Sequence, residues 1–313
     1  MRRTLTSLGT VCGVAVFVFV MLRALPGNQI IAGFGTEAAA LTPAQRTALE
    51  AYYGLDKPLI VQFFTWIGGV VTGNLGYSAS ANHSVLELTA HSLPVTLELA
   101  LISIVIAFLI GVPLGMFSAS KPDSIRDATG QVIGLAGLSI PSFLLATALL
   151  SWLSSSLGFN PNGAGYATLT ENPELNLKQM LLPALVLGFG IAAPIMRTTR
   201  TAVLDVRSLD FVRTARAKGV PPRRLQFVHV LGNALLPIIT MTGLQFGYLL
   251  GGAVVVEQIF SLPGIGRQVL IGIQHKEYAV VQSTVLVIAV LFVIVNLVTD
   301  LLYRMIDPRV RAE

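Results

Sequence analysis

Three cations, Arg213, Arg216 and Lys218, have the spacing best suited to bind another molecule, because they lie two or three residues apart. The small residues Ala215 and Ala217 alternate with them. On a short helix, small side chains allow close approach to a groove of another protein, and the cations set the register. The alternative is a solvated basic segment attracted to anionic lipid. Both interpretations make this segment a binding element.

The sequence lacks the residue sets that would support catalysis or metal binding. An intramembrane enzyme would need a Ser with His, paired Asp or an H-E-x-x-H motif within its apolar segments. The four histidines, His83, His91, His229 and His275, lie outside those segments, and none belongs to a metal shell with Cys or carboxylates. The phosphate-binding motif G-x-x-x-x-G-K-[S/T] is also missing. We therefore expect a non-catalytic protein with no metal site and no cofactor of its own.

The composition is that of a membrane protein. Of 313 residues, 53% are hydrophobic and 12% are charged, whereas soluble domains carry about 25% charged residues. Disorder and a disulfide scaffold are excluded, the latter because Cys12 is the single cysteine. A bilayer core needs about 20 apolar residues per helix. The sequence predicts an all-α fold with about six transmembrane helices, at residues 7–25, 94–118, 131–152, 180–196, 234–257 and 280–303.

The distribution of basic residues predicts the orientation. With the N-terminus inside, 15 of the 21 Lys and Arg residues lie in inner segments and six in outer segments. This bias places both termini in the cytoplasm, and it argues against a nucleic-acid partner because topology alone explains the basic residues. A cleaved signal peptide is the alternative for the first run, but Arg23 and Pro26 lie where a small-x-small cleavage site is needed. An uncleaved anchor at residues 1–25 fits better.

Residues 26–93 form the longest segment predicted outside the membrane. Aromatic residues among aliphatic ones indicate a small folded outer domain. We predict a helix over residues 44–53, begun by Thr42-Pro43 and ended by Gly54, and an apolar interfacial stretch over residues 59–71. The alternative is a packing unit with no ligand of its own. Residues 94–313 are then a core of five transmembrane helices.

The loop at residues 197–233 has clear helix boundaries. Ser208 is suited to cap a helix that has Asp210 in its first turn, and Gly219 is suited to the left-handed C-terminal position. Pro221-Pro222 prevents continuation. We expect a helix of about ten residues, about 15 Å long. A second helix is predicted to start near Pro222 and to return to the membrane.

Several motifs follow one another along the chain. They lie at residues 54–58 (GLDKP), 73–78 (GNLGYS), 210–219 (DFVRTARAKG), 233–237 (NALLP, preceded by His229), 257–266 (EQIFSLPGIG), 296–300 (NLVTD) and 307–309 (DPR). Together they resemble the inner-membrane permeases of binding-protein-dependent ABC importers, specifically the dipeptide, oligopeptide and nickel group. The chain departs from that group at Asn74, where Asp is more common. The resemblance implies the ABC importer type I permease fold, in the bacterial cytoplasmic (inner) membrane.

In such permeases the inner loop is the coupling helix, which docks on an ATPase subunit. The general importer motif begins Glu-Ala-Ala there; this chain has Arg213-Thr214-Ala215, which matches the peptide subgroup and makes the helix positive. The implied partners are a second homologous permease subunit, two ATP-binding subunits that hold ATP and Mg²⁺, an extracytoplasmic substrate-binding protein and the lipid bilayer. By resemblance, coupling is assigned to Arg213, Thr214, Ala215, Arg216, Ala217, Lys218 and Gly219.

Polar side chains within spans are candidates for the translocation path, because they tend to face the bundle interior or a wet cavity. Met241, Gln245 and Tyr248 share one face of the fifth span, and Asn296 and Asp300 share one face of the sixth. The alternative role is interhelical hydrogen bonding that holds the bundle together.

The segment between the fifth and sixth spans is a candidate outer gate or contact for the binding protein. Residues 263–266 are expected to turn tightly, and the flanking apolar residues are expected at the outer membrane surface. The candidate residues are Glu257, Pro263, Gly264, Gly266 and Arg267.

Taken with the resemblance, these features predict the transmembrane subunit of an ATP-driven importer for di- and oligopeptides, forming half of the translocation path. A permease of the same family for nickel, glutathione or haem is the nearer alternative. A self-contained secondary transporter is the other, but such proteins usually carry midspan ionisable residues. Here only Glu98 and Asp300 qualify, and both lie toward span ends.

Overall fold

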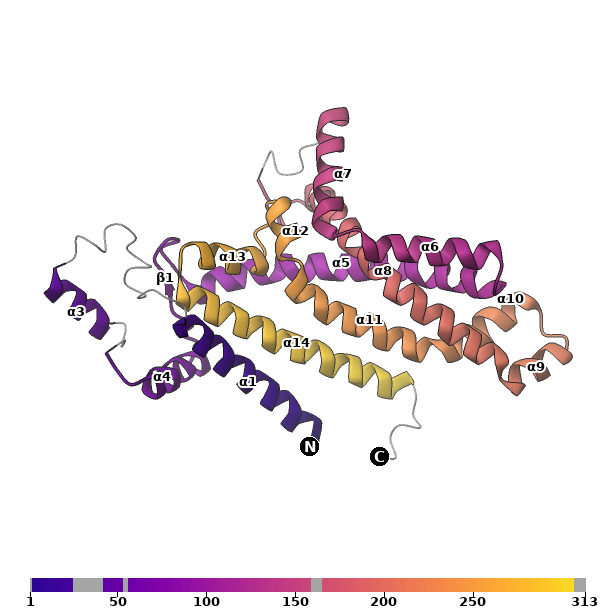
Figure 1. Cartoon of the computed structure of the whole chain (residues 1–313), viewed down its shortest axis with the longest axis horizontal. Helices are drawn as coiled ribbons and strands as arrows, with labels where there is room; N and C mark the ends of the chain where they lie inside the picture. Colours follow the sequence, from indigo (N-terminus) through magenta and orange to yellow (C-terminus); the bar gives the residue numbers. More distant parts are fainter. Residues whose placement is uncertain (1, 25–41, 53–55, 159–164, 307–313) are drawn as a thin grey trace. The chain divides into compact units, whose positions relative to one another are not determined.

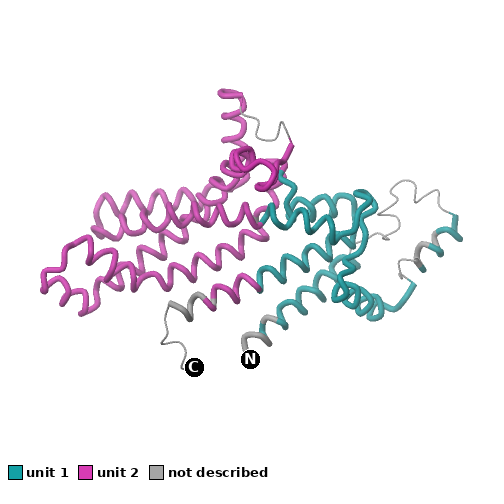
Figure 2. Tube along the Cα trace, turned by 180° about the vertical axis from the view of Figure 1, so that it is seen from behind, with its two compact units in different colours: residues 1–96, 262–293 teal, residues 97–261, 294–313 magenta. Residues whose placement is uncertain are grey.

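The computed structural model describes residues 2–24, 42–52, 56–158 and 165–306, and these are almost entirely helical (Figure 1). The predicted all-α class is therefore confirmed. The chain divides into two compact units, which Figure 2 shows in different colours. Unit 1 comprises residues 1–96 and 262–293, and unit 2 comprises residues 97–261 and 294–313.

Unit 1 is helical apart from a two-residue antiparallel ladder, in which Tyr77 pairs with Ser84 and Ser78 with His83. Its elements are α1 (Arg2–Ala24), α3 (Pro43–Tyr52), α4 (Leu59–Val71), β1 (Tyr77–Ser78), β2 (His83–Ser84), α13 (Ile265–Gln274) and the beginnings of α5 (Val85–Ser120) and α14 (Tyr278–Ile306).

The helix predicted within residues 26–93 forms, and the apolar stretch predicted at residues 59–71 is also a helix. Helix α4 has the predicted bounds, and α3 lies one residue earlier than predicted. Thr42 begins α3 with a reciprocal cap: its hydroxyl accepts from the Gln45 N–H at 3.3 Å, and the Gln45 Oε1 accepts from the Thr42 N–H at 2.9 Å. This is a capping box, which satisfies backbone donors at the start of a helix.

Unit 2 is built around the long helix α8 (Pro173–Ser208), which packs against α6 (Ile125–Ser139) and α11 (Gly232–Gly252). Glycines let α5 approach α8 closely: a Cβ at Gly115 would lie 2.6 Å from the Met196 carbonyl oxygen. The remaining elements are α7 (Ser142–Leu157), α9 (Asp210–Ala217), α10 (Pro222–Arg224), a π-helix η2 (Leu225–Leu231) and α12 (Val254–Ile259).

Four helices in the described part of the chain are long and apolar enough to cross a membrane, at residues 85–120, 173–208, 222–251 and 278–299. The bent pair α6–α7 would make a fifth. The first predicted span corresponds to the shorter apolar helix Leu8–Ala24. Several membrane-spanning helices are therefore present, although this length and composition test does not reach six.

The third predicted span, residues 131–152, is wrong as a single helix. Helices α6 and α7 meet at an angle of 92°. Ile140 between them is extended, with φ −86° and ψ 115°, and Pro141 follows. A residue before proline is forced out of the helical region, and proline has no N–H to donate. The Ile140-Pro141 pair therefore breaks the span, and Figure 1 shows α7 leaving the direction of α6.

The predicted ends of the fourth and fifth spans are also wrong. Helix α8 has 36 residues and continues through Pro183 and Pro194, whereas an apolar run alone predicts only residues 180–196. Its polar ends are helical too: Asn172 caps the start by accepting from the Leu175 N–H at 3.1 Å. Helix α11 ends at Gly252, and α12 begins after Ala253.

Candidate coupling helix and transport path

Helix α9 carries most of the predicted coupling residues. It has eight residues, Asp210–Ala217, rather than the predicted ten. The predicted Ser208 cap is wrong, because Ser208 ends α8 and its hydroxyl donates to the Asp205 carbonyl at 2.7 Å. Serine commonly bonds back to its own helix in this way. The single extended residue Leu209 then separates α8 from α9.

Gly219 ends α9 as predicted, in the left-handed region with φ +78°. The Gly219 N–H donates to the Arg216 carbonyl at 3.0 Å, and the Val220 N–H donates to the Ala215 carbonyl at 3.2 Å. These two bonds form a Schellman motif, which satisfies the last carbonyls of the helix. Pro221, also as predicted, lies just before the next helix.

One side chain anchors α9, and most of the others face outward. Val212 is 1% exposed. Of the seven predicted coupling residues, Ala215 is half-buried and the other six are exposed. Arg213 Nη1 lies 3.4 Å from Asp210 Oδ1, but both side chains are well exposed. The outward face of α9 is therefore small, basic and available to another molecule.

After the turn that ends α9, α10, the π-helix η2 and α11 follow one another without a break, as the prediction of a second helix near Pro222 requires. Figure 1 shows α9 between the ends of α8 and α10. Leu225 and Val230 of η2 are buried, whereas Phe227 and Val228 are both 59% exposed. The π-helical segment itself was not predicted, and π-segments are frequent at functional sites.

Arg207, in the last turn of α8, connects the coupling loop to the end of α5. Its Nη1 donates to the carbonyls of Ala119 and of Ser120, the latter at 3.3 Å. Its Nη2 donates to Oε1 of Gln226 in η2 at 3.0 Å. The last carbonyls of a helix lack partners within the helix, and a cation there also complements the helix dipole. Arg207 therefore holds three segments of unit 2 together.

Asp127, near the start of α6, forms a buried ion pair with Arg200 of α8. Arg200 Nε donates to Oδ1 at 2.7 Å and Nη2 to Oδ2 at 2.6 Å. The Ser118 hydroxyl donates to Oδ1 at 2.6 Å, and the Asp123 N–H donates to Oδ2 at 3.1 Å. Asp127 is 2% exposed. This network joins α5, α6 and α8.

Sequence reasoning does not single out Asp127, Arg200 or Arg207, because charges beside span ends are expected on the cytoplasmic side. One signal in the sequence could have indicated the ion pair. Residues 124–173 contain two carboxylates, Asp127 and Glu171. A lone carboxylate beside a span is costly to bury unless a cation pairs with it.

Unit 2 contains the predicted path residues. Met241 and Gln245 of α11 and Asn296 of α14 are half-buried, whereas Tyr248 is 70% exposed. Among the described residues, neither Gln245 nor Asn296 has a side-chain hydrogen bond. The structure thus provides no interhelical hydrogen bond for the alternative role of these two side chains. The side chain of Asp300 lies outside the described residues.

The two helices that carry these residues approach closely. A Cβ at Gly243 of α11 would lie 2.3 Å from Thr299 Cγ2 of α14. By helical periodicity Gly243 lies on the side of α11 away from Met241 and Gln245, so this contact joins the two helices without placing the predicted path face against α14.

The predicted tight turn at residues 263–266 is wrong. Gly264 has φ −88° and ψ 171°, and Gly266 is buried within α13. The left-handed residue is instead Ser261, with φ +52°. The Ile265 N–H at the start of α13 donates to the Thr96 hydroxyl at 2.8 Å. The segment is therefore a capped helix start that follows a turn at Ser261.

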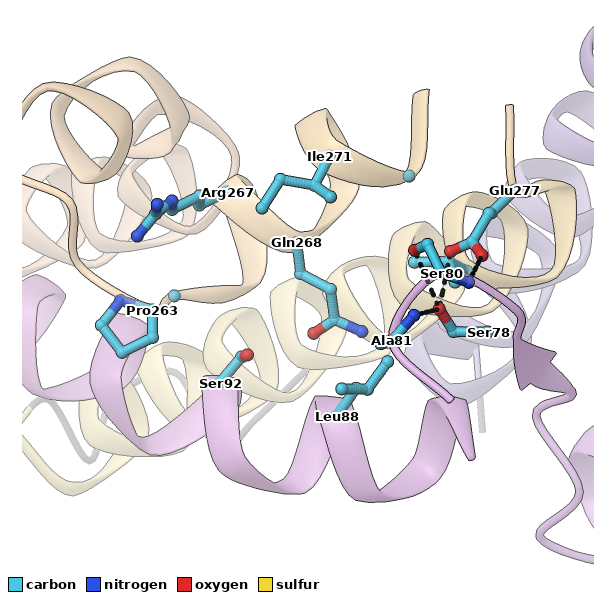
Figure 3. Close-up of a pocket in the computed structure, with 13 residues that line it drawn as sticks. Ser78, Ser80, Ala81, Leu88, Ser92, Pro263, Arg267, Gln268, Ile271 and Glu277 are labelled. Atoms are coloured by element: carbon cyan, nitrogen blue, oxygen red, sulfur yellow. Dashed lines mark hydrogen bonds between the residues drawn. The ribbon is translucent and has the colours of Figure 1, made fainter. Parts of the chain in front are cut away.

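Pro263, Gly264 and Arg267 line a pocket of about 200 Å³ in unit 1 (Figure 3). Opposite Pro263 and Arg267 in this view lies Glu277, whose carboxylate accepts from the Ser78 hydroxyl at 2.7 Å and from the Ser80 N–H, also at 2.7 Å. The remaining gate candidate, Glu257, belongs to unit 2, where its side chain is fully buried in α12.

Glu98 is part of a polar cluster in unit 2 rather than an isolated carboxylate. Its Oε2 accepts from the Tyr166 hydroxyl at 3.4 Å and from Asn176 Nδ2 at 3.3 Å. Gln179 Nε2 donates to the Gly165 carbonyl at 2.6 Å. Burial, followed by the charge of Glu98, raises the pKa of Tyr166 above its usual range. The cluster fixes residues 165–167 against α8 with the tyrosine protonated.

Comparison with protein-family models shows which proteins this chain resembles. A family model described as "Binding-protein-dependent transport system inner membrane component" matches residues 111–312. A second model, for the N-terminal part of the membrane component of such systems, matches residues 1–100.

Individual relatives match along their whole length. The chain is 38% identical over 314 residues to the oligopeptide transport system permease protein AppB of Bacillus subtilis, covering 99% of this chain and 98% of AppB. It is 34% identical over 333 residues to the dipeptide transport system permease protein DppB of Escherichia coli, with coverage of 99% and 98%. The inward-facing MetNI methionine ABC transporter has a similar fold, with a TM-score of 0.56 and 18% identity, covering 70% of this chain and 96% of that chain.

Proposed function

Because this chain belongs to the family of inner-membrane components of binding-protein-dependent ABC importers, we propose that it is the permease subunit of a peptide importer, forming half of the path for di- and oligopeptides. Relatives named for oligopeptide and dipeptide transport support this substrate class over nickel, glutathione or haem.

The geometry of helix α9 is the main support for the coupling role. It is short, it is fixed at its C-terminus by the Schellman motif of Gly219, and its face beyond Val212 is exposed and basic. A rigid helix loses little conformational freedom when it docks, which favours binding. Arg213, Arg216 and Lys218 then select an acidic rim on the partner ATPase.

The proposed division of labour makes this chain non-catalytic. Two partner ATPase subunits bind ATP and Mg²⁺, a second homologous permease supplies the other half of the path, and an extracytoplasmic binding protein delivers the peptide. The chain has no cofactor of its own. Movement of the ATPase pair would reach α5 through α9 and Arg207, since Arg207 bonds to both the loop and the end of α5.

We propose that four residues line the translocation path, with Tyr248 as a further candidate. They are Met241, Gln245, Asn296 and Asp300. In support, the amide groups of Gln245 and Asn296 have no hydrogen bond to another described residue. A peptide passing through would offer backbone N–H and C=O groups to such amides. At the outer side, we propose Pro263, Gly264, Gly266 and Arg267 as contacts for the binding protein, and Glu257 as a further gate residue.

The proposal is tested by purifying the tagged chain in mild detergent from its own membrane and identifying its companions by mass spectrometry. Wild type is compared with Ala215→Glu, which places a bulky anion on the close-approach face of α9. Ala51→Glu, at an exposed site on α3, is the matched control. Uptake of a labelled dipeptide, hexapeptide, Ni²⁺ and haem is measured in cells that carry each variant.

We expect ATPase subunits and a second permease to copurify with wild type and with the Ala51 variant, and the ATPase to be lost from the Ala215 variant together with peptide uptake. A wild-type preparation without any ATPase would overturn the importer role. Uptake of Ni²⁺ or haem but of neither peptide would replace the substrate class and leave the coupling role intact.

A further inference from the structure

An apolar groove of about 460 Å³ runs between α1 and α4 in unit 1. Arg23 is its one charged lining residue, and every other lining side chain is aliphatic or aromatic. The lining consists of Val16, Phe19, Val20, Arg23, Ala24, Leu59, Ile60, Phe63 and Phe64.

Aromatic packing holds the two helices around this groove. The Phe19 ring meets Phe63 edge-on, with centroids 5.2 Å apart, and stacks on Trp66 at 6.1 Å. The rim is open: Val20 is 56% exposed and Phe64 is 64% exposed. In a protein of the inner membrane, exposed apolar side chains on an apolar helix are available to lipid acyl chains.

Arg23 lies at one end of the groove without an anionic partner. Its Cζ is 3.5 Å from the centroid of the Phe19 ring. Its Nε donates to Gln62 Oε1 at 3.0 Å, and its Nη1 donates to Gln282 Oε1 at 3.5 Å. Both acceptors are neutral amides. Within the described parts of the chain, no carboxylate pairs with Arg23, and its Nη2 donates to no acceptor.

This arrangement differs from that of Arg200, a half-buried arginine of unit 2, which is neutralised by Asp127. A partly desolvated guanidinium gains most from an anion that accepts two parallel N–H bonds, as a phosphate does. Phe19 and Gln62 already orient the Arg23 guanidinium. A cation without an anionic partner at the end of an apolar groove matches a phospholipid, because the cation can bind the phosphate and the groove can hold an acyl chain.

We propose that this groove is a phospholipid site, in which one acyl chain lies between α1 and α4 and the phosphate of an anionic headgroup binds Arg23. The charge selects the occupant: a net-neutral lipid offers the same acyl chain but weaker attraction. One basic residue near a membrane surface favours an anionic lipid by about fivefold. The site is separate from the coupling helix and from the path candidates, so its test does not depend on the peptide substrate.

Other occupants are conceivable and give different results. Residues 25–41 follow directly after Ala24 and include the carboxylate Glu37, and a second subunit could also cover the groove. Either would keep lipid away from Phe19 and Trp66.

The experiment uses tryptophan fluorescence, because the chain has only two tryptophans, Trp66 and Trp152. In a Trp152→Phe background, Trp66 alone reports on the groove through its contact with Phe19. The full-length chain is placed in nanodiscs of phosphatidylcholine with a minor fraction of brominated lipid, either phosphatidylglycerol or phosphatidylcholine. The bromines are on the acyl chain and quench the fluorescence of a nearby tryptophan. Arg23→Gln and Arg23→Lys are compared with the control Lys57→Gln, at an exposed cation that does not line the groove.

We expect brominated phosphatidylglycerol to reach half-maximal quenching at about one-fifth of the fraction that brominated phosphatidylcholine requires. Arg23→Gln should abolish this preference, while Arg23→Lys and Lys57→Gln should retain it. Equal quenching by both lipids in wild type would overturn the proposal, and so would a preference that survives Arg23→Gln. No quenching by either lipid would show that protein covers the groove, which also overturns it. The comparison of quenching by the two lipids in the chain with native Arg23 tests the proposal even if an Arg23 variant does not fold.

Discussion

The turn at residues 118–131 and the loop at residues 208–222 both connect helices of unit 2, but they use their charges in opposite ways. In the turn, Asp127 is 2% exposed, and Arg200, Ser118 and a backbone N–H all donate to it. In the loop, the ion pair of Arg213 with Asp210 has a distance of 3.4 Å and side chains that are 74% and 94% exposed. A buried charge depends on its partner, because loss of the partner leaves it uncompensated, whereas exposed charges remain available to another protein.

The largest expected effect is at the turn. Asp127→Ala leaves the Arg200 guanidinium half-buried without its anion, which we expect to destabilise the chain by about 3 kcal/mol. The measurement is the unfolding midpoint of the purified chain in detergent, together with its abundance in the membrane. Asp123→Asn is the matched control, because Asp123 donates its backbone N–H to Asp127 while its exposed carboxylate makes no hydrogen bond to Asp127 or Arg200. Equal destabilisation by both variants would contradict the importance of the buried pair.

Arg207 lies between the two regions and sharpens the comparison. Arg207→Gln should remove the bonds to the end of α5 and weaken the contact with Gln226, costing about 1 to 2 kcal/mol of stability. If Arg207 also transmits movement, ATP hydrolysis by the assembled transporter should continue while peptide uptake per ATP falls. Arg207→Lys should restore stability in part but not this ratio, since an ammonium cannot keep the forked geometry. Uptake and hydrolysis falling in proportion would indicate a purely structural role.

Sequence reasoning predicted where the helix of the inner loop ends, but it did not predict the buried ion pair. Gly219 and Pro221-Pro222 are signals that act through local backbone geometry, and their effects appear where predicted. The same local logic missed the break at Ile140-Pro141, because apolar composition continued across it and outweighed the proline. Asp127 and Arg200 are 73 residues apart, and a pairing at that separation depends on how α6 packs on α8. The Ser208 cap failed because its hydroxyl had a second acceptor within reach, the Asp205 carbonyl.

Gly219→Ala tests the rigidity of the loop. The site has space for a Cβ, so the cost comes from φ +78° alone, about 1 kcal/mol for a non-glycine residue in the left-handed region. This cost should distort the end of α9 and reduce copurifying ATPase several-fold, with little change in the unfolding midpoint of the chain. Gly232→Ala is the control, since Gly232 also has open space but takes helical φ −53°. ATPase retention in the Gly219 variant would contradict a docking surface that depends on the shape of this helix end.

The smallest effect on the fold, and the clearest separation of the two regions, is expected from Arg213→Ala. An exposed pair at helical spacing contributes about 0.3 kcal/mol, so the unfolding midpoint should stay at the wild-type value. Binding of the ATPase should nevertheless weaken, and the loss should shrink as salt rises, because salt shortens the range over which exposed charges interact, to about 8 Å at roughly 0.15 M. Titration of copurifying ATPase against salt concentration measures both. A lowered midpoint with unchanged ATPase binding would reverse the assignment, because it would make Arg213 part of the fold, as Asp127 is, and not part of the docking surface.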